Sequence, residues 1–182
     1  GRFDAGMLYY CPQIWCSDNT DAIERLRIQY GTSFGYPMSS VSAHVSVCPN
    51  HQNHRVTPFK TRGICAMQGT FGYELDLSKM TDEEKKMAGE QIAFFKEHGR
   101  LFQFGDYYRL TSPFENRDYT VWEYAAQDGS EACMSVVYTD MYANAASEIV
   151  KWKGLDPKKV YQMQLDGEDA GNFSGAALMH AG

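Results

Sequence analysis

The chain has 182 residues, of which 43% belong to the hydrophobic set and 22% are charged. This composition is typical of a folded globular protein and excludes a disordered tail. Seventeen Lys and Arg residues against 23 Asp and Glu residues give a net charge of −6. The charge argues against nucleic acid as a partner, because binding phosphates requires a basic surface. No apolar run approaches the ~20 residues that a membrane-spanning helix needs, so no membrane partner is expected either.

Short apolar runs alternate with helical patterns over the first hundred residues. After the first runs, Asp21 and Glu24 have the spacing of a capping box, which predicts the start of a helix. This helix would place Ile23, Leu26 and Tyr30 on one face and end at the glycine that follows.

A second set of strand and helix signals comes next. Residues 41–47 alternate in the manner of a strand, and an apolar run at 64–67 leads into residues 71–77. The capping box at 81–84 then predicts a helix that ends near Gly99. Such alternation of strands and helices is typical of parallel βα units.

The pattern changes at about residue 101. Short apolar runs are now separated by turn signals such as Ser112-Pro113 and Asp128-Gly129, which predicts an antiparallel β-sandwich. The expected strands are residues 101–110, 119–126, 132–139, 148–152, 160–165 and 173–179. We therefore expect two domains, an incomplete α/β layer at 1–100 and an all-β module at 101–182 that is truncated at its end.

The two ends of the chain are unusual for an intact protein. The sequence begins with Gly1-Arg2, without an initiator Met or the apolar segment of a signal peptide. The first dozen residues resemble a packed interior, and the last ones lie inside an apparent strand and its turn. Because the termini of small proteins are usually polar and poorly ordered, we expect a piece of a longer polypeptide.

Five cysteines are scattered along the chain, at positions 11, 16, 48, 65 and 133. Cys11 and Cys16 are too far apart for a CxxC redox pair and have no matching partners for zinc. Buried free thiols in a reducing compartment are the expectation, without a structural disulfide. Cysteine usage therefore favours a cytoplasmic location.

Asp18 is the first candidate for chemistry. It follows an apolar strand and directly precedes a helix, and in α/β barrels the residues that act on substrates lie on loops at the C-terminal ends of strands. Two interpretations stay open for it, helix capping and acid–base chemistry, although Asp21 is the stronger capping candidate. Trp15, three residues earlier, belongs either to the core or to the same pocket.

The remaining polar and aromatic clusters are less specific. His44, His51 and His54 lack a further ligand at a suitable spacing, so loop hydrogen bonding is favoured over a metal site, and neither a metal nor a cofactor is expected. Gly69 to Gly72 lacks the Lys-Ser/Thr of a phosphate loop. Four aromatic residues, Tyr9, Tyr10, Phe34 and Tyr36, are expected to fill a barrel interior.

Several stretches closely resemble the retaining α-galactosidases (melibiases) of glycoside hydrolase family 36, in their bacterial-type branch. They are Gly-Arg-Phe-Asp-Ala-Gly-Met-Leu-Tyr-Tyr (1–10), Trp-Cys-Ser-Asp-Asn-Thr-Asp-Ala (15–22), Ile-Gln-Tyr-Gly-Thr-Ser (28–33), Ala-His-Val-Ser (43–46), Pro-Asn-His-Gln (49–52) and Phe-Gly-Tyr-Glu-Leu-Asp-Leu (71–77). The resemblance implies that residues 1–100 hold the last strands and helices of a (β/α)8 barrel. It implies that residues 101–182 form most of the family's C-terminal antiparallel sandwich.

The resemblance also implies a mechanism. Asp18 matches the family's proton donor in the Ser-Asp-Asn-Thr-Asp motif, whereas the Lys-Trp-Asp motif that carries the nucleophile is absent here. Cys16, where relatives often carry Thr, is a mild departure. The substrates would be terminal α-galactosides such as melibiose and raffinose, the parent enzyme would be a homo-oligomer (a tetramer), and the 182 residues alone would be inactive.

Other functions stay open at this point. The related α-N-acetylgalactosaminidases and raffinose-synthase-type transglycosidases differ mainly in residues that this sequence does not contain. A non-catalytic carbohydrate-binding module would need exposed aromatic side chains in a row on one sheet face. Trp122, Tyr124 and Tyr138 instead alternate as core residues would.

Overall fold

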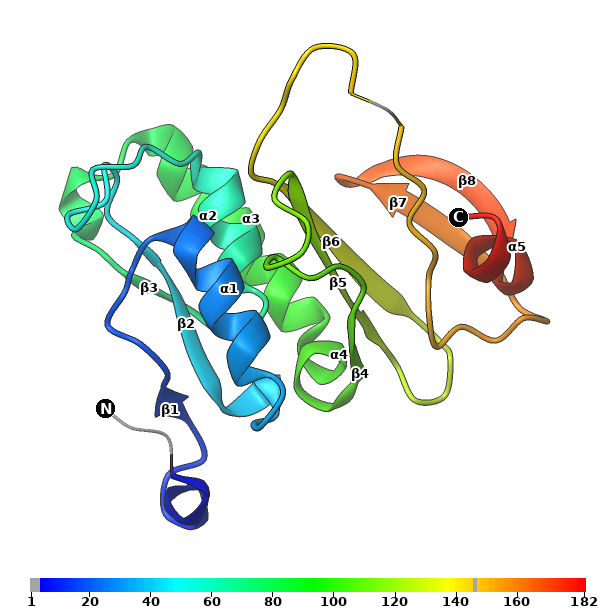
Figure 1. The fold of residues 1–182 in the computed structure, drawn as a ribbon, viewed down its shortest axis with the longest axis horizontal. Coiled ribbons are helices and arrows are strands. Elements are labelled where there is room, and N and C mark those ends of the chain that lie inside the picture. Colours follow the sequence, from blue (N-terminus) through cyan, green and yellow to red (C-terminus); the bar gives the residue numbers. More distant parts are fainter. Residues whose placement is uncertain (1–3, 146) are drawn as a thin grey trace.

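The computed structural model describes residues 4–145 and 147–182, and its elements pass from an α/β part to a mainly antiparallel part (Figure 1). The first part contains η1 (Ala5–Tyr9), β1 (Ile14–Trp15), α1 (Ala22–Thr32), η2 (Met38–Ser40), β2 (Val41–Ser46), α2 (Phe59–Ala66), β3 (Thr70–Glu74), η3 (Leu77–Lys79), α3 (Asp82–Glu97) and α4 (Gly99–Phe104). The second contains β4 (Asp106–Arg109), β5 (Tyr119–Ala125), β6 (Ala132–Tyr138), β7 (Val160–Leu165), β8 (Glu168–Ser174) and α5 (Gly175–His180).

Strands β1, β2 and β3 form an open parallel sheet in that order, as the βα pattern predicts. Ile14 is aligned with Val41, and Ser42 with Thr70. The central strand β2 is buried on both faces, which is typical of a parallel sheet with a covering layer of helices. The sheet and its helices are thus consecutive parallel βα units.

The two predicted helices form, with their predicted caps. Asp21 caps α1 by accepting a hydrogen bond from the Glu24 amide, and Thr81 and Glu84 make both halves of a capping box at the start of α3. Helix α1 ends at Thr32 rather than Gly31. Its buried face differs from the prediction, because two polar side chains accompany Leu26 there; they are Arg25 and Gln29.

Four other segments differ from the prediction. The apolar run at 64–67 lies mostly in helix α2. The start of the predicted strand 101–110 is helix α4, which buries Leu101 and Phe102, and strand β4 begins only at Asp106. The predicted strand 173–179 ends at Ser174, whose side chain caps α5. Residues 148–152 are not assigned to a strand.

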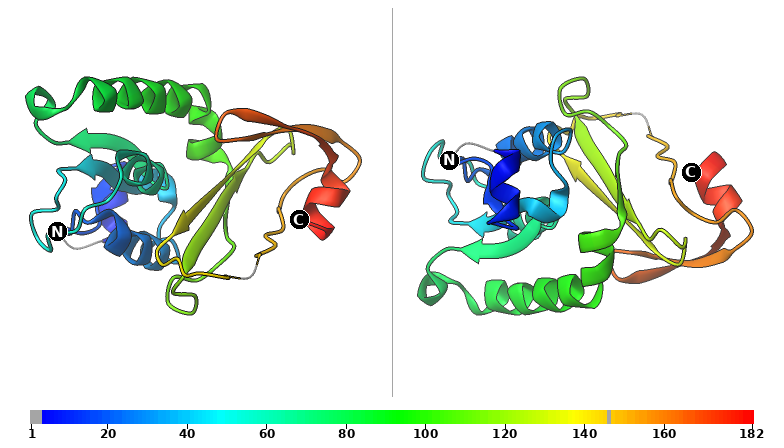
Figure 2. Two further views of the ribbon diagram at one scale, coloured as in Figure 1. Left: turned by 90° about the horizontal axis from the view of Figure 1, so that it is seen from above. Right: turned by 90° about the horizontal axis from the view of Figure 1, so that it is seen from below.

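The antiparallel part consists of two sheets. Strands β4, β5 and β6 form one of them, and β7 and β8 form a two-stranded hairpin. Figure 2 shows the first sheet lying between the α/β layer and the hairpin. The predicted fold class, α/β followed by antiparallel β-structure, is therefore confirmed.

One apolar cluster joins the two parts of the chain. It combines Leu26, Val41 and Cys65 from the α/β part with Trp122 and Tyr124 from the antiparallel part. Trp122 is 1% exposed, so burial of its ring contributes on the order of 3 kcal/mol at this junction.

The aromatic predictions have mixed outcomes. Trp122 and Tyr124 are core residues, as expected, but Tyr138 is 56% exposed, and its ring contacts Tyr119 across the strands. Tyr9, Tyr10 and Phe34 are also exposed, and Tyr36 is half-buried, so none of these four fills an interior within the described residues. Most of η1 is exposed as well, in contrast to the packed interior that its composition indicates.

Glu123 is a buried carboxyl in the middle of β5. It is 0% exposed, and its two oxygens accept the Lys153 amide at 3.0 and 3.3 Å, which holds the long segment before β7 against the sheet. Burial, partly offset by this hydrogen bond, raises the pKa of Glu123 to about 7.

Glu123→Gln should change the pH dependence of stability. In the unfolded chain the carboxyl loses its proton near pH 4.5, and in the folded chain near pH 7, so folding is opposed increasingly as the pH rises between these values. The slope is up to about 1.4 kcal/mol per pH unit. The Gln side chain keeps an acceptor for the Lys153 amide and carries no charge. Thermal unfolding at pH 5 and pH 8 should therefore show the variant gaining on the unmodified protein at pH 8.

The matched control is Glu115→Gln, which changes an exposed carboxylate. Equal pH dependence of the Glu123→Gln variant and the unmodified protein would contradict the prediction.

Candidate functional site

Two loops meet at the C-terminal ends of β1 and β2. The first, residues 16–21, contains Asp18, and the second follows β2. The Gln52 side chain joins them, because its Nε2 donates to the Asp18 carbonyl at 3.0 Å and its Oε1 accepts the Thr20 amide at 3.1 Å. The buried Asn50 adds a hydrogen bond to Thr20 Oγ1 at 2.9 Å. The first loop is thus held from the side by its neighbour.

Arg25 holds the backbone of the same loop. Its side chain is almost fully buried, and NH1 donates to the carbonyls of Ser17 and Asn19, both at 3.1 Å. NH2 donates to Cys16 Sγ at 3.2 Å and to the Ser42 carbonyl in β2 at 2.8 Å. Asp18 therefore lies between two backbone carbonyls that one guanidinium fixes.

Asp21 and Asp18 have different environments. Asp21 is 1% exposed, caps α1 and forms an ion pair with Arg55. Asp18 is exposed, and in the described parts of the chain its carboxylate has neither a hydrogen bond nor an ion pair. Capping, the alternative interpretation of Asp18, is thus performed by Asp21. The Asp18 side chain is available for another task.

Trp15 lies at the edge of a hollow on the sheet. Its ring stacks on His44 with centroids 4.4 Å apart, and the two line an open hollow of about 450 Å³ with Phe71, Tyr73 and Glu74 of β3. Asp18 is not among the residues that line this hollow. Trp15 therefore lines a hollow, but this hollow does not include Asp18, so the structure does not place the two residues in the same pocket.

His44 adds an unusual imidazole to the hollow. Its two nitrogens are buried without a hydrogen-bond partner among the described residues, although Nε2 lies 2.9 Å from Glu74 Oε2. Burial and, to a smaller extent, the positive charge of Arg25 lower the pKa of His44 to about 4. The imidazole is therefore neutral near pH 7, where it can donate or accept a proton in a hydrogen bond.

The other histidines of the predicted cluster have no shared site. His51 and His54 are exposed, and Nδ1 of His51 is 3.5 Å from Thr20 Oγ1. Within residues 4–145 and 147–182, no group of three or more His, Cys, Asp or Glu side chains could hold a metal ion. All five cysteines are free thiols.

Sequence reasoning missed Arg25 and Gln52, the two side chains that hold the Asp18 loop. Arg25 lies on the helical face that also carries Gln29, and a charged residue amid an apolar face is the signal that could have identified it. Gln52 gave no signal, because its contacts are 32 and 34 residues away along the chain.

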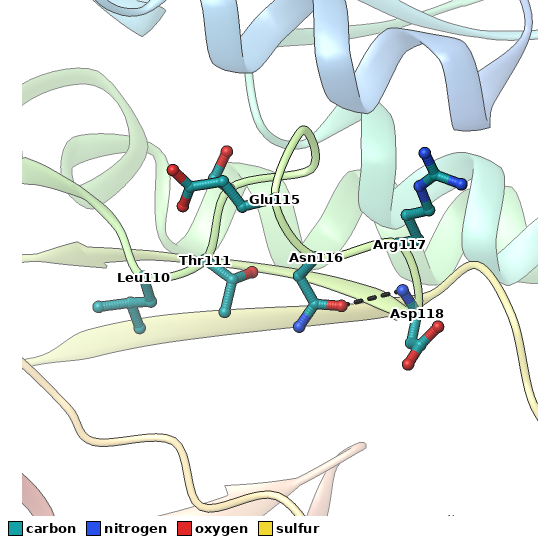
Figure 3. Close-up of a pocket in the computed structure, with 7 residues that line it drawn as sticks. Leu110, Thr111, Glu115, Asn116, Arg117 and Asp118 are labelled. Atoms are coloured by element: carbon teal, nitrogen blue, oxygen red, sulfur yellow. Dashed lines mark hydrogen bonds between the residues drawn. The ribbon is translucent and has the colours of Figure 1, made fainter.

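A second hollow lies in the antiparallel part of the structure. It measures about 630 Å³ and is lined by residues 110–112 and 115–118 of the segment that connects β4 and β5 (Figure 3). Asn116 Oδ1 accepts the Asp118 amide at 2.9 Å, so its polar side chain closes a turn. The carboxylates of Glu115 and Asp118 point away from each other (Figure 3). This hollow therefore has no convergent chemistry.

Among the residues that the structure describes, none of the helices combines the length and apolar character that crossing a bilayer requires.

Two family models match the chain. The model described as Melibiase covers residues 1–105, and the Glycosyl hydrolase family 36 C-terminal domain covers residues 119–182. Among curated proteins, the bifunctional alpha-galactosidase/sucrose kinase AgaSK of Mediterraneibacter gnavus is 53% identical over all of this chain and 19% of its own length. Alpha-galactosidase AgaA of Geobacillus stearothermophilus is 51% identical, over all of this chain and 24% of its own.

Solved structures agree with these matches. The galactosidase domain of AgaSK superposes with a TM-score of 0.93 at 53% identity, covering 100% of this chain and 25% of that one. A variant of AgaA from Geobacillus stearothermophilus, solved in complex with raffinose, gives a TM-score of 0.94 at 50% identity with the same coverage. The chain thus spans a quarter or less of the length of these relatives.

Substitutions of Asp21 and Asp18 should have different effects on the stability of the fold. Asp21→Ala removes the cap of α1 and the partner of Arg55, and should lower the free energy of unfolding by about 1–3 kcal/mol. Asp18→Ala should change it by less than about 0.5 kcal/mol, because the carboxylate is exposed and unpartnered in the described structure. Urea unfolding followed by tryptophan fluorescence measures both. A loss for Asp18→Ala as large as that for Asp21→Ala would show that Asp18 has a structural role.

Proposed function

Because the chain belongs to glycoside hydrolase family 36, the melibiases, we propose that it forms part of a retaining α-galactosidase that releases terminal α-D-galactose from oligosaccharides. The position of Asp18 carries this proposal. Its backbone is fixed at the C-terminal end of a parallel strand, where barrel enzymes act on their substrates, while its carboxylate stays unpartnered within the described residues.

Asp18 acts as the general acid and base of a double displacement. A nucleophilic carboxylate, which these 182 residues do not supply, attacks the anomeric carbon as Asp18 gives its proton to the departing glycosidic oxygen. Asp18 then takes a proton from water, whose oxygen attacks the glycosyl-enzyme and releases galactose with its α configuration. Such an acid must stand about 5 Å from the nucleophile.

Substrate binding on this chain involves Trp15. An indole ring can stack on the apolar face of a galactose ring. Trp15 lies in β1, the strand that precedes the Asp18 loop, and lines the hollow on the sheet. Relatives solved with raffinose and with stachyose support α-galactosides such as raffinose and melibiose as the substrates.

The proposal extends to the organisation of the whole protein. Residues 1–100 are the last part of its catalytic barrel and residues 101–182 its terminal module. The complete enzyme is a homo-oligomer, a tetramer, and the five free cysteines support a reducing, cytoplasmic location. No cofactor takes part in this mechanism.

Asp18→Asn in the complete enzyme should show the signature of a lost acid. The rate of glycosylation, measured as kcat/KM, should fall by ~10²–10⁴-fold on raffinose, whose sugar leaving group needs a proton. It should change little on a nitrophenyl α-galactoside, whose leaving group departs as a stable anion. With the aryl substrate, added azide should raise kcat and yield α-galactosyl azide, because azide attacks the glycosyl-enzyme without a general base.

Asp140→Asn, which changes an exposed aspartate far along the chain, is the matched control and should leave both substrates unaffected. Equal losses on raffinose and the aryl galactoside for Asp18→Asn would show that Asp18 is not the acid.

The 182 residues alone should not hydrolyse α-galactosides measurably. An acid without its nucleophile supplies one half of the mechanism, because no glycosyl-enzyme can form. Release of nitrophenol from an aryl α-galactoside by the purified chain measures this. Turnover near that of a full-length relative would contradict the prediction.

A further inference from the structure

A row of buried hydrogen bonds runs from the Asp18 loop into the antiparallel sheet. It begins at Arg25, whose NH1 holds the carbonyls on both sides of Asp18. The Nε of Arg25 donates to Gln29 Oε1 at 2.9 Å, one turn further along α1. The direction of the guanidinium is therefore set by Gln29.

Gln29 is in turn fixed by Gln68. Its Nε2 donates to Gln68 Oε1 at 2.6 Å and to the Cys65 carbonyl at 3.0 Å, at the end of α2. Both glutamine side chains are 0% exposed. The Gln29 amide therefore directs its oxygen to the guanidinium and its nitrogen to Gln68. If the amide were turned over, its NH2 group would face the N–H donor of Arg25.

Two tyrosines of the sheet formed by β4, β5 and β6 complete the row. Gln68 Nε2 donates to Tyr107 Oη in β4 at 2.6 Å, and Tyr124 Oη in β5 donates to the Gln68 carbonyl. The rings of the two tyrosines lie 5.1 Å apart. Burial raises the pKa of each phenol, so both hydroxyls keep their protons near pH 7.

The row passes through the apolar junction between the two parts of the chain. Leu26, Cys65 and Phe102 belong to the cluster around it, and water has little access to replace a lost hydrogen bond. A buried polar network of this kind has one satisfied arrangement, since each unpaired donor or acceptor costs about 1–3 kcal/mol. A change at Gln68 therefore removes one of the two hydrogen bonds that hold the Gln29 amide nitrogen, and Gln29 in turn contacts Arg25.

We propose that Gln68 is a positioning residue for Asp18, which acts through Gln29 and Arg25 and makes the geometry of the acid dependent on the antiparallel sheet. The proposal rests on the proposed function of Asp18. Its physical basis is the steep dependence of proton transfer on geometry, because a displacement of about 1 Å can lower a catalysed rate by ~10²-fold.

The test uses Gln68→Met in the complete enzyme, a substitution of similar length that removes the amide donor and leaves only a weak sulfur acceptor. We expect kcat/KM on raffinose to fall at least about tenfold, and kcat/KM on a nitrophenyl α-galactoside to fall less than about twofold. The KM for raffinose should stay within about twofold, because the substrate contacts are unchanged. Gln103→Met, on the exposed side of α4, is the matched control and should alter neither substrate.

Tyr107→Phe removes only the hydroxyl that Gln68 contacts and keeps the packing of the ring. This variant should also lower kcat/KM on raffinose relative to kcat/KM on the aryl galactoside, by a smaller factor than Gln68→Met. If Gln68→Met does not fold, Tyr107→Phe alone decides the test. Equal losses on both substrates, or an unchanged ratio, would overturn the proposal while leaving the function of Asp18 intact. If Asp18→Asn itself shows no dependence on the leaving group, the proposed function fails, and this inference with it.

Discussion

The buried guanidinium of Arg25 is the interaction on which the arrangement of the site depends. A cation in an apolar interior is unfavourable unless its donors are all satisfied. Each of the five N–H groups of Arg25 has an acceptor, and three of these acceptors are backbone carbonyls, of Ser17, Asn19 and Ser42. Because the acceptors come from a loop, a strand and a helix, they fix those three elements relative to one another.

This requirement explains features of the α/β part that packing alone does not. The loop after β1 must turn so that two of its carbonyls face inward, which exposes the side chain between them. Cys16 must lie where its sulfur can accept a hydrogen bond from NH2 of Arg25. A Thr at this position would offer a hydroxyl oxygen for the same purpose.

The parts of the fold that could be predicted are those with local causes. The caps at Asp21 and Thr81 depend on contacts three residues away, and both form as their spacing indicates. Helix α4 could not be predicted in this way. Its six residues are too few to establish a helical period, and the burial of Leu101 and Phe102 against distant residues decides its conformation. Similarly, α5 begins at a cap, Ser174, inside a run that alternates like a strand.

The candidate site shows the same division. Its loop could be located from the transition between strand and helix, and Asp21 could be distinguished from Asp18 by its spacing to Glu24. Of the side chains that hold the loop, Gln52 could not be identified, because it reaches the loop across 32 and 34 residues of sequence. Arg25 gives one local signal, a charged residue on the buried face of its helix.

An acid–base carboxylate has two needs that conflict. Its position must be fixed, yet a hydrogen bond or ion pair to the carboxylate itself would bias its protonation and hinder proton transfer. The loop resolves the conflict by fixing the backbone of Asp18 through Arg25 and Gln52 and by giving the structural tasks to Asp21, which caps the helix and pairs with Arg55. Since the guanidinium is itself held through Gln29, Gln68 and Tyr107, hydrogen bonds connect the backbone that carries this carboxylate with the junction between the two sheets.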